Sequence, residues 1–195
     1  MKIAAVQLNS TADVKENLAL VEAELVKAQA MSVDLVSLPE MFAVMSSNSQ
    51  LALSVKEPFG AGPIQSFLSR VAKQYQLWLV AGTIPITNTT ESTRYHAACL
   101  VYNPEGECVA RYDKMHLFDV RLQLESGELE QHQESKTVIA GTETKMVETP
   151  WGHLGLSVCY DLRFPVWARN TEDYDVLLYV ANWPKPRILA WDALL

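Results

Sequence analysis

Residues 155–165 read Gly155-Leu156-Ser157-Val158-Cys159-Tyr160-Asp161-Leu162-Arg163-Phe164-Pro165. An apolar run ends at Cys159, and Pro165 then begins a predicted helix. This pattern puts a thiol on the turn after the carboxyl end of a strand, where open α/β sheets hold their active sites. The backbone N–H groups of the following helix would favour the thiolate. A buried structural cysteine is the alternative, and for a lone cysteine it is the commoner case.

Two upstream segments each end a predicted strand on a residue that could act together with such a thiol. The run Asp34-Leu35-Val36-Ser37-Leu38-Pro39-Glu40-Met41-Phe42 places Glu40 directly after an apolar strand and a proline. The run Arg111-Tyr112-Asp113-Lys114-Met115-His116-Leu117-Phe118-Asp119 places Lys114 at the end of a strand-like run. Either charge alone would be a solvated surface group. Together, three strand ends present a carboxylate, an amine and a thiol.

In this order, the three segments resemble the nitrilase superfamily of carbon–nitrogen hydrolases. The resemblance also covers residues 1–7 (Met-Lys-Ile-Ala-Ala-Val-Gln) and 180–184 (Val-Ala-Asn-Trp-Pro). Residues 159–165 and 167–187 are most similar to the branch of omega-amidases and deaminated glutathione amidases. The resemblance implies an α/β fold, a four-layer α-β-β-α sandwich, and a Glu-Lys-Cys triad.

The resemblance also implies a role for each member of this triad. Glu40 would be the general base toward Cys159, and it should therefore be partly desolvated. Lys114 and the backbone N–H of Tyr160 would stabilise the oxyanion of the tetrahedral intermediate. Neither a metal ion nor an organic cofactor is required by this chemistry. The expected reaction is hydrolysis of a small amide with release of ammonia through a cysteine thioester.

The run Gln133-Glu134-Ser135-Lys136 resembles the family segment that carries a second glutamate. The resemblance implies that Glu134 would orient the lysine or the attacking water. The alternative is one more acid in an acidic loop. Asn182 and Trp183 resemble residues that line the family's pocket, although a tryptophan in the core is an equal alternative. Phe42 is expected to form another wall.

Charged and sulfur-containing neighbours of the triad have simpler interpretations. We expect Asp161 and Arg163 to pair and to brace the turn, and contact of Arg163 with a substrate carboxylate is the minority alternative. His116 is expected in core packing or in a hydrogen bond rather than in catalysis. Cys99 and Cys108 fall in a predicted hairpin and are expected to be inert.

Hydrophobic periodicity predicts strands and helices that alternate, with hairpins in the middle of the chain. Asp13 with Glu16 has the spacing of a capping box, and Gly62-Pro63 marks the start of a helix. Residues 122–143 are the longest predicted loop, an acidic segment that is either a lid or a solvated excursion. The predicted strands cover residues 1–8, 34–38, 77–83, 95–102, 108–113, 145–149, 153–159 and 176–181.

Composition limits the partners. A net charge of −7 argues against nucleic acid or an anionic membrane surface. No apolar run is long enough to cross a bilayer, and we expect no leader before the first strand. Three cysteines without C-x-x-C spacing indicate a reducing cytoplasm, and four scattered histidines do not indicate a metal site. We therefore expect a cytoplasmic enzyme with a small-molecule amide substrate, and the resemblance implies a homo-oligomer.

The 195 residues suit a single carbon–nitrogen hydrolase domain over 1–195. Members of the family continue beyond the helix expected after Arg187, so the carboxyl-terminal part is expected to be missing. A catalytically inactive fragment that acts as an interaction subunit or remnant is therefore the alternative to an amidase. A thiol redox sensor is a weaker third hypothesis, because no resolving cysteine lies near Cys159 in sequence. Nitrile, carbamoyl or larger amide substrates also remain open.

Overall fold

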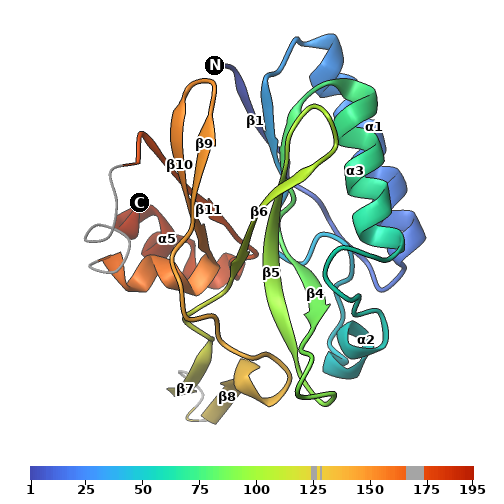
Figure 1. Cartoon of the computed structure of the whole chain (residues 1–195). Coiled ribbons are helices and arrows are strands. Elements are labelled where there is room, and N and C mark those ends of the chain that lie inside the picture. The colour runs from blue at the N-terminus through green and yellow to red at the C-terminus, as the bar shows by residue number, and fades with distance from the viewer. Residues whose placement is uncertain (124–126, 128, 166–173) are drawn as a thin grey trace.

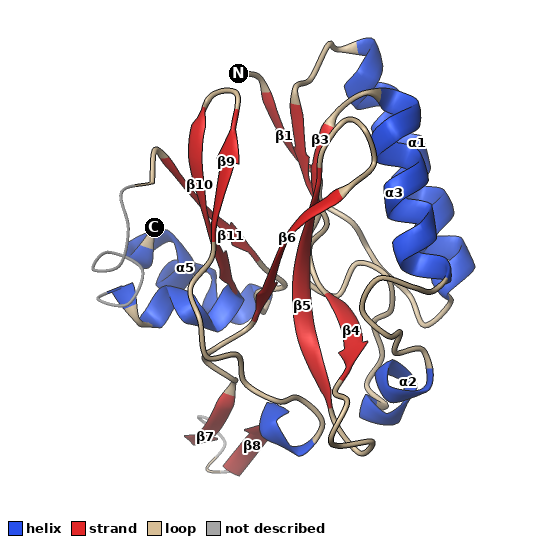
Figure 2. Ribbon diagram, viewed as in Figure 1, coloured by secondary structure: helices blue, strands red, loops and turns tan. Residues whose placement is uncertain are grey.

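The computed structural model describes residues 1–123, 127, 129–165 and 174–195. Two β-sheets face one another, and helices lie on the outer side of each, as Figures 1 and 2 show. The predicted four-layer α-β-β-α arrangement of an α/β protein is therefore present. Within the described part of the chain, no helix is both long and apolar enough to cross a membrane.

The first sheet holds six strands in the order β1-β2-β3-β5-β4, with β6 also paired to β5. β1, β2 and β3 run parallel, and β5 is antiparallel to each of its partners. The strands are β1 Ile3–Ala5, β2 Leu35–Ser37, β3 Trp78–Val80, β4 Ile84–Thr87, β5 Tyr95–Tyr102 and β6 Cys108–Asp113.

The second sheet has the order β11-β10-β9, in which β10 is parallel to β11 and antiparallel to β9. A separate two-stranded hairpin pairs β7 with β8. These strands are β9 Met146–Thr149, β10 Gly152–Val158, β11 Val176–Val180, β7 Asp119–Gln123 and β8 Leu129–Gln133.

Two long helices, α1 and α3, pack side by side on the outer face of the first sheet (Figure 1). A shorter helix, α5, lies beside the second sheet on the opposite side of the molecule. The α-helices are α1 Val14–Ala30, α2 Ser49–Ser54, α3 Pro63–Tyr75 and α5 Ile188–Leu194, and the 3-10 segments are Glu134–Lys136, Cys159–Arg163 and Lys185–Arg187.

Strand alternation divides the apolar side chains of the first sheet between two cores, because neighbours on a strand point to opposite faces. Val36 on β2 faces the helices, whereas its neighbour Leu35 faces the second sheet. Leu79 and Val80 on β3 divide in the same way. The second sheet supplies the other half of the inner core, from Val147, Leu154, Leu156, Val158 and Val180.

Both long helices begin where their sequences predict. Asp13 caps α1 by accepting from two backbone N–H groups, at 2.8 and 3.1 Å. The predicted capping box is incomplete, because the Glu16 carboxylate accepts from the Thr11 hydroxyl at 2.8 Å instead of returning to the cap. Pro63 begins α3, and the buried carboxylate of Glu57 accepts from backbone N–H groups in its first turn.

Both predicted hairpins, β5–β6 and β9–β10, are confirmed. Two other expectations need correction, and the prediction also lacks β4. The strand predicted over residues 1–8 covers only β1, which is half exposed because it lies at the edge of its sheet. The predicted loop 122–143 contains β8, whose cross-strand bonds to β7 outweigh its polar sequence. β4 was not predicted, because Pro85 masks its strand pattern.

Some predictions fall where the structure says nothing. One such prediction is the helix after Pro165, which would extend over residues 166–173, and the other is the part of the predicted loop that holds Glu125 and Glu128. Both lie outside the described residues, as does Trp167.

Candidate active site

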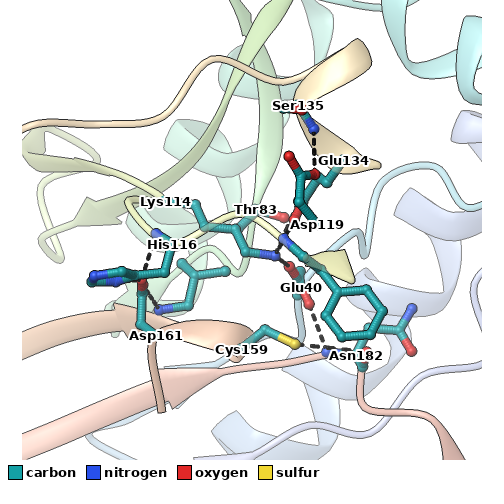
Figure 3. A network of polar contacts seen from close by, with 12 residues as sticks. Glu40, Thr83, Lys114, His116, Asp119, Glu134, Ser135, Cys159, Asp161 and Asn182 are labelled. Carbon is teal, nitrogen blue, oxygen red and sulfur yellow. Dashed lines mark hydrogen bonds and ion pairs between the residues drawn. The ribbon is translucent and has the colours of Figure 1, made fainter. Parts of the chain in front are cut away.

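The carboxyl ends of β2, β6 and β10 meet between the two sheets. Glu40 follows β2, Lys114 follows β6, and Cys159 follows β10. Their side chains point toward one another in Figure 3, although 74 residues separate the first two in sequence. The structure therefore brings together the three residues that the sequence singled out.

Glu40 lies on a tight turn and is only 6% exposed. One carboxylate oxygen accepts a 2.8 Å hydrogen bond from Lys114 Nζ, and the other accepts a 2.9 Å bond from the backbone N–H of Asn182. The turn is held by Met41, whose N–H donates to the Thr83 hydroxyl at 2.9 Å. Glu40 therefore has the desolvation that its expected role requires.

Lys114 is 2% exposed and is shared between two carboxylates. Its Nζ lies 2.8 Å from Glu40 and 3.0 Å from Glu134. Burial alone would lower the pKa of Lys114, but the negative charges of Glu40 and Glu134 raise it above its ordinary value. The two carboxylates thus favour the charged form of this amine.

Glu134 begins the 3-10 turn after β8 and is fixed from two sides. It accepts from Lys114 and from the backbone N–H of Phe118 at 2.6 Å. Burial raises the pKa of Glu134, an effect that Lys114 opposes and the nearby Glu40 charge increases. The second glutamate predicted from the sequence thus lies against the lysine.

Cys159 occupies a strained position at the end of β10. Its φ of 47° is in the left-handed region, which costs a residue with a side chain about 1–3 kcal/mol and persists only where the surroundings enforce it. The side chain is 8% exposed, and its Sγ lies 3.8 Å from the carbonyl oxygen of Asn182. The turn thus presents the thiol to the space between the sheets.

The expectation that neighbouring N–H groups favour the thiolate of Cys159 is wrong for the protein at rest. Burial raises the pKa of this thiol well above its ordinary value, and the charge of Glu40 and a hydrogen bond to it raise the pKa further. The Lys114 charge and the Asn182 carbonyl contact only partly oppose this rise. Burial and the Glu40 charge thus outweigh the Lys114 charge, and they favour the protonated thiol.

The predicted Asp161–Arg163 pair is also absent among the described residues. Asp161 accepts instead from Tyr112, His116 and the backbone N–H of Val158. The Arg163 guanidinium lies over the ring of Trp183, 5.7 Å from its centroid. The reason is local geometry: the 3-10 turn directs Asp161 toward β6 and Arg163 toward the cavity.

A cavity of about 340 Å³ opens above the three clustered residues. Asn182 and Trp183 line it, as the resemblance implied, and so do Tyr160 and Arg163, the latter in agreement with its minority alternative. Phe42 does not: it is fully buried in the core between the first sheet and its helices, because the turn after Glu40 directs it away from the site. Other lining residues include Met41, Val44, Tyr95, Phe118, Thr137, Val138 and Arg187.

Several contacts at the site were not predicted from sequence. The backbone of Asn182 bridges Glu40 and Cys159, while its side chain turns outward to Met45. Tyr112 was missed as well, although it precedes Lys114 by two residues and shares its strand face. Period-two alternation was the signal that could have found it. Among the described residues, no group of three or more His, Cys, Asp or Glu side chains is arranged to hold a metal ion.

Comparison with known proteins agrees with this fold. The sequence model described as carbon-nitrogen hydrolase matches residues 2–194. The chain therefore belongs to the carbon-nitrogen hydrolase family, that is, to the nitrilase superfamily.

Individual relatives support the same assignment. The chain is 39% identical over 163 residues to omega-amidase YafV of Escherichia coli strain K12, and 33% identical over 163 residues to the deaminated glutathione amidase of Yersinia enterocolitica. These alignments cover 83% and 84% of the chain, but 56% and 55% of the relatives. The chain thus spans about half the length of the curated relatives that it matches.

A solved structure agrees with the fold. XC1258 of Xanthomonas campestris, a CN-hydrolase superfamily protein with an arsenic adduct in its active site, superposes with a TM-score of 0.80 at 30% identity. The match covers 99% of this chain and 69% of that one.

Proposed function

We propose that this chain carries the catalytic residues of an amidase that hydrolyses the terminal amide of a short dicarboxylic or keto-acid monoamide. The carrying observation is that three side chains meet beside one cavity: the Glu40 carboxylate contacts the Lys114 ammonium, and both charges lie close enough to the Cys159 thiol to shift its pKa. A base, a cation and a nucleophile within reach of one bound group are what acyl transfer needs.

In the acylation step, Cys159 Sγ attacks the amide carbon while its proton moves to Glu40. The oxygen becomes negative, and the Lys114 ammonium and the N–H of Tyr160 stabilise it. Glu40 then returns the proton to the amide nitrogen. The carbon–nitrogen bond breaks, ammonia leaves, and a thioester remains on Cys159.

In the deacylation step, Glu40 takes a proton from water as its oxygen attacks the thioester carbon. The second tetrahedral intermediate collapses with cleavage of the carbon–sulfur bond. The proton returns to the Cys159 sulfur, and the free carboxylic acid leaves. Glu134 holds Lys114 in place throughout, through the contact it already makes.

A raised thiol pKa is compatible with this scheme. The proton stays on Cys159 until attack, and the nearby Glu40 carboxylate receives it. A neutral thiol avoids the cost of a second buried negative charge beside Glu40 in the resting site.

The substrate class rests on the charges of the cavity and on the relatives. Arg163 and Arg187 both line the cavity, so a substrate with a carboxylate at one end and an amide at the other has a cation for its far end. Curated relatives are named omega-amidase and deaminated glutathione amidase. Nitrile or carbamoyl substrates would use the same triad and remain alternatives.

The chemistry also needs a reduced thiol. Cys99, Cys108 and Cys159 are all free. We therefore extend the proposal to a reducing compartment such as the cytoplasm.

Alkylation by iodoacetamide, resolved by peptide mass spectrometry, tests the proposal without a guessed substrate. If exposure governed the rate, the exposed Cys108 would react before the buried Cys159. We expect the opposite order near neutral pH, because Glu40 assists Cys159. Lys114→Ala should lower the Cys159 rate by about tenfold or more, the effect of one or more pKa units. If all three cysteines react like a free peptide thiol, the site is not assembled in this chain.

A positive alkylation result justifies a second assay. Monoamides of four- and five-carbon dicarboxylic and keto acids would be incubated with the protein, and ammonia would be measured. Cys159→Ala is the matched control, since it removes the nucleophile and leaves the cavity walls. Equal ammonia from both proteins would refute hydrolysis by this site.

A further inference from the structure

The carboxylate of Asp161 is the centre of a second buried network next to the triad. Asp161 is 4% exposed, and both of its oxygens accept two hydrogen bonds. Oδ1 accepts from His116 N–H at 2.9 Å and lies 2.7 Å from His116 Nδ1. Oδ2 accepts from the Tyr112 hydroxyl at 2.7 Å and from Val158 N–H at 2.8 Å. A carboxylate has about four acceptor sites, so all of them are in use.

The four donors come from both sides of the triad. Tyr112 precedes Lys114 by two residues, and His116 follows it by two. Val158 is the residue directly before Cys159. Figure 3 shows Asp161 between the segment of Lys114 and His116 and the turn of Cys159. One side chain therefore joins the end of β6 in the first sheet to the end of β10 in the second.

We propose that Asp161 is a positioning residue, which clamps the turn of Cys159 to the strand end that carries Lys114 and so sets the separation of thiol and ammonium. Its functional meaning rests on the proposed amidase chemistry. Asp161 itself does not touch the substrate cavity, because its oxygens face Tyr112, His116 and the backbone.

A carboxylate can accept at both oxygens, whereas an amide of equal size can accept at only one of its two terminal atoms. An asparagine at position 161 would turn its N–H₂ group toward one of the two pairs of neighbours, either the two groups of His116 or the Tyr112 hydroxyl with Val158 N–H. The Tyr112 hydroxyl can rotate, and the His116 ring can change tautomer, to accept from it. The backbone N–H groups of Val158 and His116 cannot, so one of them would face another donor and lose its partner. Asp161→Asn, although equal in size, should therefore open one side of the clamp.

The backbone at Cys159 explains why a clamp is needed there. A left-handed residue with a side chain returns to a relaxed conformation unless its neighbours hold it. Asp161 holds the peptide that leads into Cys159, through Val158 N–H. Release of that bond would let the thiol move away from Lys114 and Glu40.

Hydrogen exchange tests the clamp without any reference to activity. Asp161→Asn should speed exchange at the amides of Val158 or His116. The matched control is Glu57→Gln, which converts another buried carboxylate with backbone donors, those of Ile64 and Gln65, to an amide. It should speed exchange at the start of α3 and leave Val158 and His116 unchanged. Unchanged exchange at both amides in Asp161→Asn would overturn the clamp.

A mutant cycle tests the positioning role. In the wild-type protein, Lys114→Ala should lower the ratio of the Cys159 alkylation rate to the Cys108 rate. In the Asp161→Asn protein, Lys114→Ala should not lower this ratio any further, because the clamp no longer holds the thiol near the amine. Asp161→Asn alone should lower the ratio about as much as Lys114→Ala does. A residue that only stabilised the fold would give additive effects, and so additivity would overturn the positioning role.

Rescue at position 116 gives an independent readout. His116→Asn keeps a donor at the place of Nδ1 and should retain the alkylation ratio, whereas His116→Ala should lower it. Thermal unfolding of each variant shows whether the comparison is made on folded protein. Equal ratios in the two variants would contradict a role for the ring contact.

The two proposals fail in different ways. If wild-type Cys159 has no advantage over Cys108, the amidase proposal fails, and the exchange experiment still decides whether the clamp exists. If Cys159 has an advantage that Asp161→Asn leaves intact, the positioning role fails and the amidase proposal stands.

Discussion

Glu40 and Lys114 form a buried ion pair across the sheet, with a carboxylate oxygen 2.8 Å from the ammonium nitrogen. Glu134 lies on the other side of the same ammonium, at 3.0 Å. One cation thus offsets two carboxylates where water is largely excluded, and this balance makes the site sensitive to the loss of any member.

Replacement of Lys114 by methionine should destabilise the protein strongly. The change keeps most of the side-chain length but leaves Glu40 and Glu134 facing each other without a cation. We expect the free energy of unfolding to fall by about 3–5 kcal/mol at pH 7, as measured in urea. Addition of Glu40→Gln should recover part of that loss.

The loss of unfolding free energy caused by Lys114→Met should become smaller as the pH falls. Burial raises the pKa of Glu134, and without Lys114 it should rise further. A raised carboxyl pKa gives stability that is present at low pH and lost as pH rises through the folded pKa. Lys145→Met is the control, because its partner Glu143 is 3.3 Å away and exposed, so we expect a change below about 1 kcal/mol at either pH. An equal effect of both variants would contradict the buried balance of charge.

Replacement of Gly82 by alanine should disturb Glu40 from a distance. Gly82 has a φ of 47°, and an added Cβ would lie 1.9 Å from the backbone oxygen of Pro39, the residue before Glu40. We expect a loss of unfolding free energy well beyond the ~1–2 kcal/mol of left-handed strain. The Cys159 alkylation rate should fall as well, because Glu40 moves.

Gly60→Ala isolates the strain from the clash. Gly60 has a φ of 86°, and nothing lies within 4 Å of an added Cβ. This variant should lose only the strain energy and should keep the wild-type alkylation rate. Equal behaviour of the two glycine variants in urea and in alkylation would show that the Pro39 contact is unimportant.

Phe42 should behave as a core residue and not as a wall of the pocket. It is fully buried between the first sheet and the helices, so Phe42→Ala should cost about 3–5 kcal/mol of unfolding free energy. At a temperature where the variant is folded, the alkylation rate of Cys159 should be unchanged. Trp183→Ala, which alters the cavity lining, should change that rate with a smaller cost in stability. A change in the alkylation rate for Phe42→Ala and none for Trp183→Ala would show that Phe42 belongs to the wall of the pocket.

Cys99 should make the protein sensitive to alkali. Burial raises the pKa of Cys99 from 9.0 to about 12. A thiol that must stay neutral in the folded state contributes stability that is complete below the unfolded pKa and is lost as pH rises toward the folded pKa. Between pH 9 and 12, this residue should lower the unfolding free energy by up to about 1.4 kcal/mol per pH unit.

A comparison of slopes isolates this contribution from that of other groups that titrate in alkali. Cys99→Ala should be less stable than wild type at pH 8, because it leaves a cavity, but its stability should fall less steeply between pH 9 and 10.5. Urea unfolding at several pH values measures both slopes. Parallel curves would show that Cys99 does not ionise on unfolding in this range.

Much of the site was predictable because it lies at strand ends. Strand-like runs that stop at Glu40, Lys114 and Cys159 mark the edges of sheets, and the order of these residues matches a known family. Local patterns also predicted α1, α3 and both main hairpins, since capping residues, proline and period-two alternation act over a few residues.

The structural features that the sequence did not predict have a common cause. Asp161 was paired with Arg163, two residues away, because the sequence shows only near neighbours, whereas its partner Tyr112 is 49 residues distant. β7 and β8 are polar and gain their order from pairing with each other. Pairing and packing between distant segments leave no periodic signal in the chain.

The sequence by itself thus determined which chemical groups are present and that each follows a strand. The tertiary structure alone decided what each group faces: Glu40 and Glu134 share Lys114, Asp161 binds both sides of the triad, and Phe42 turns into the core. It also set the raised pKa of Cys159. The physical reason is that backbone preferences are local, whereas burial and charge–charge contacts arise only when two sheets pack face to face.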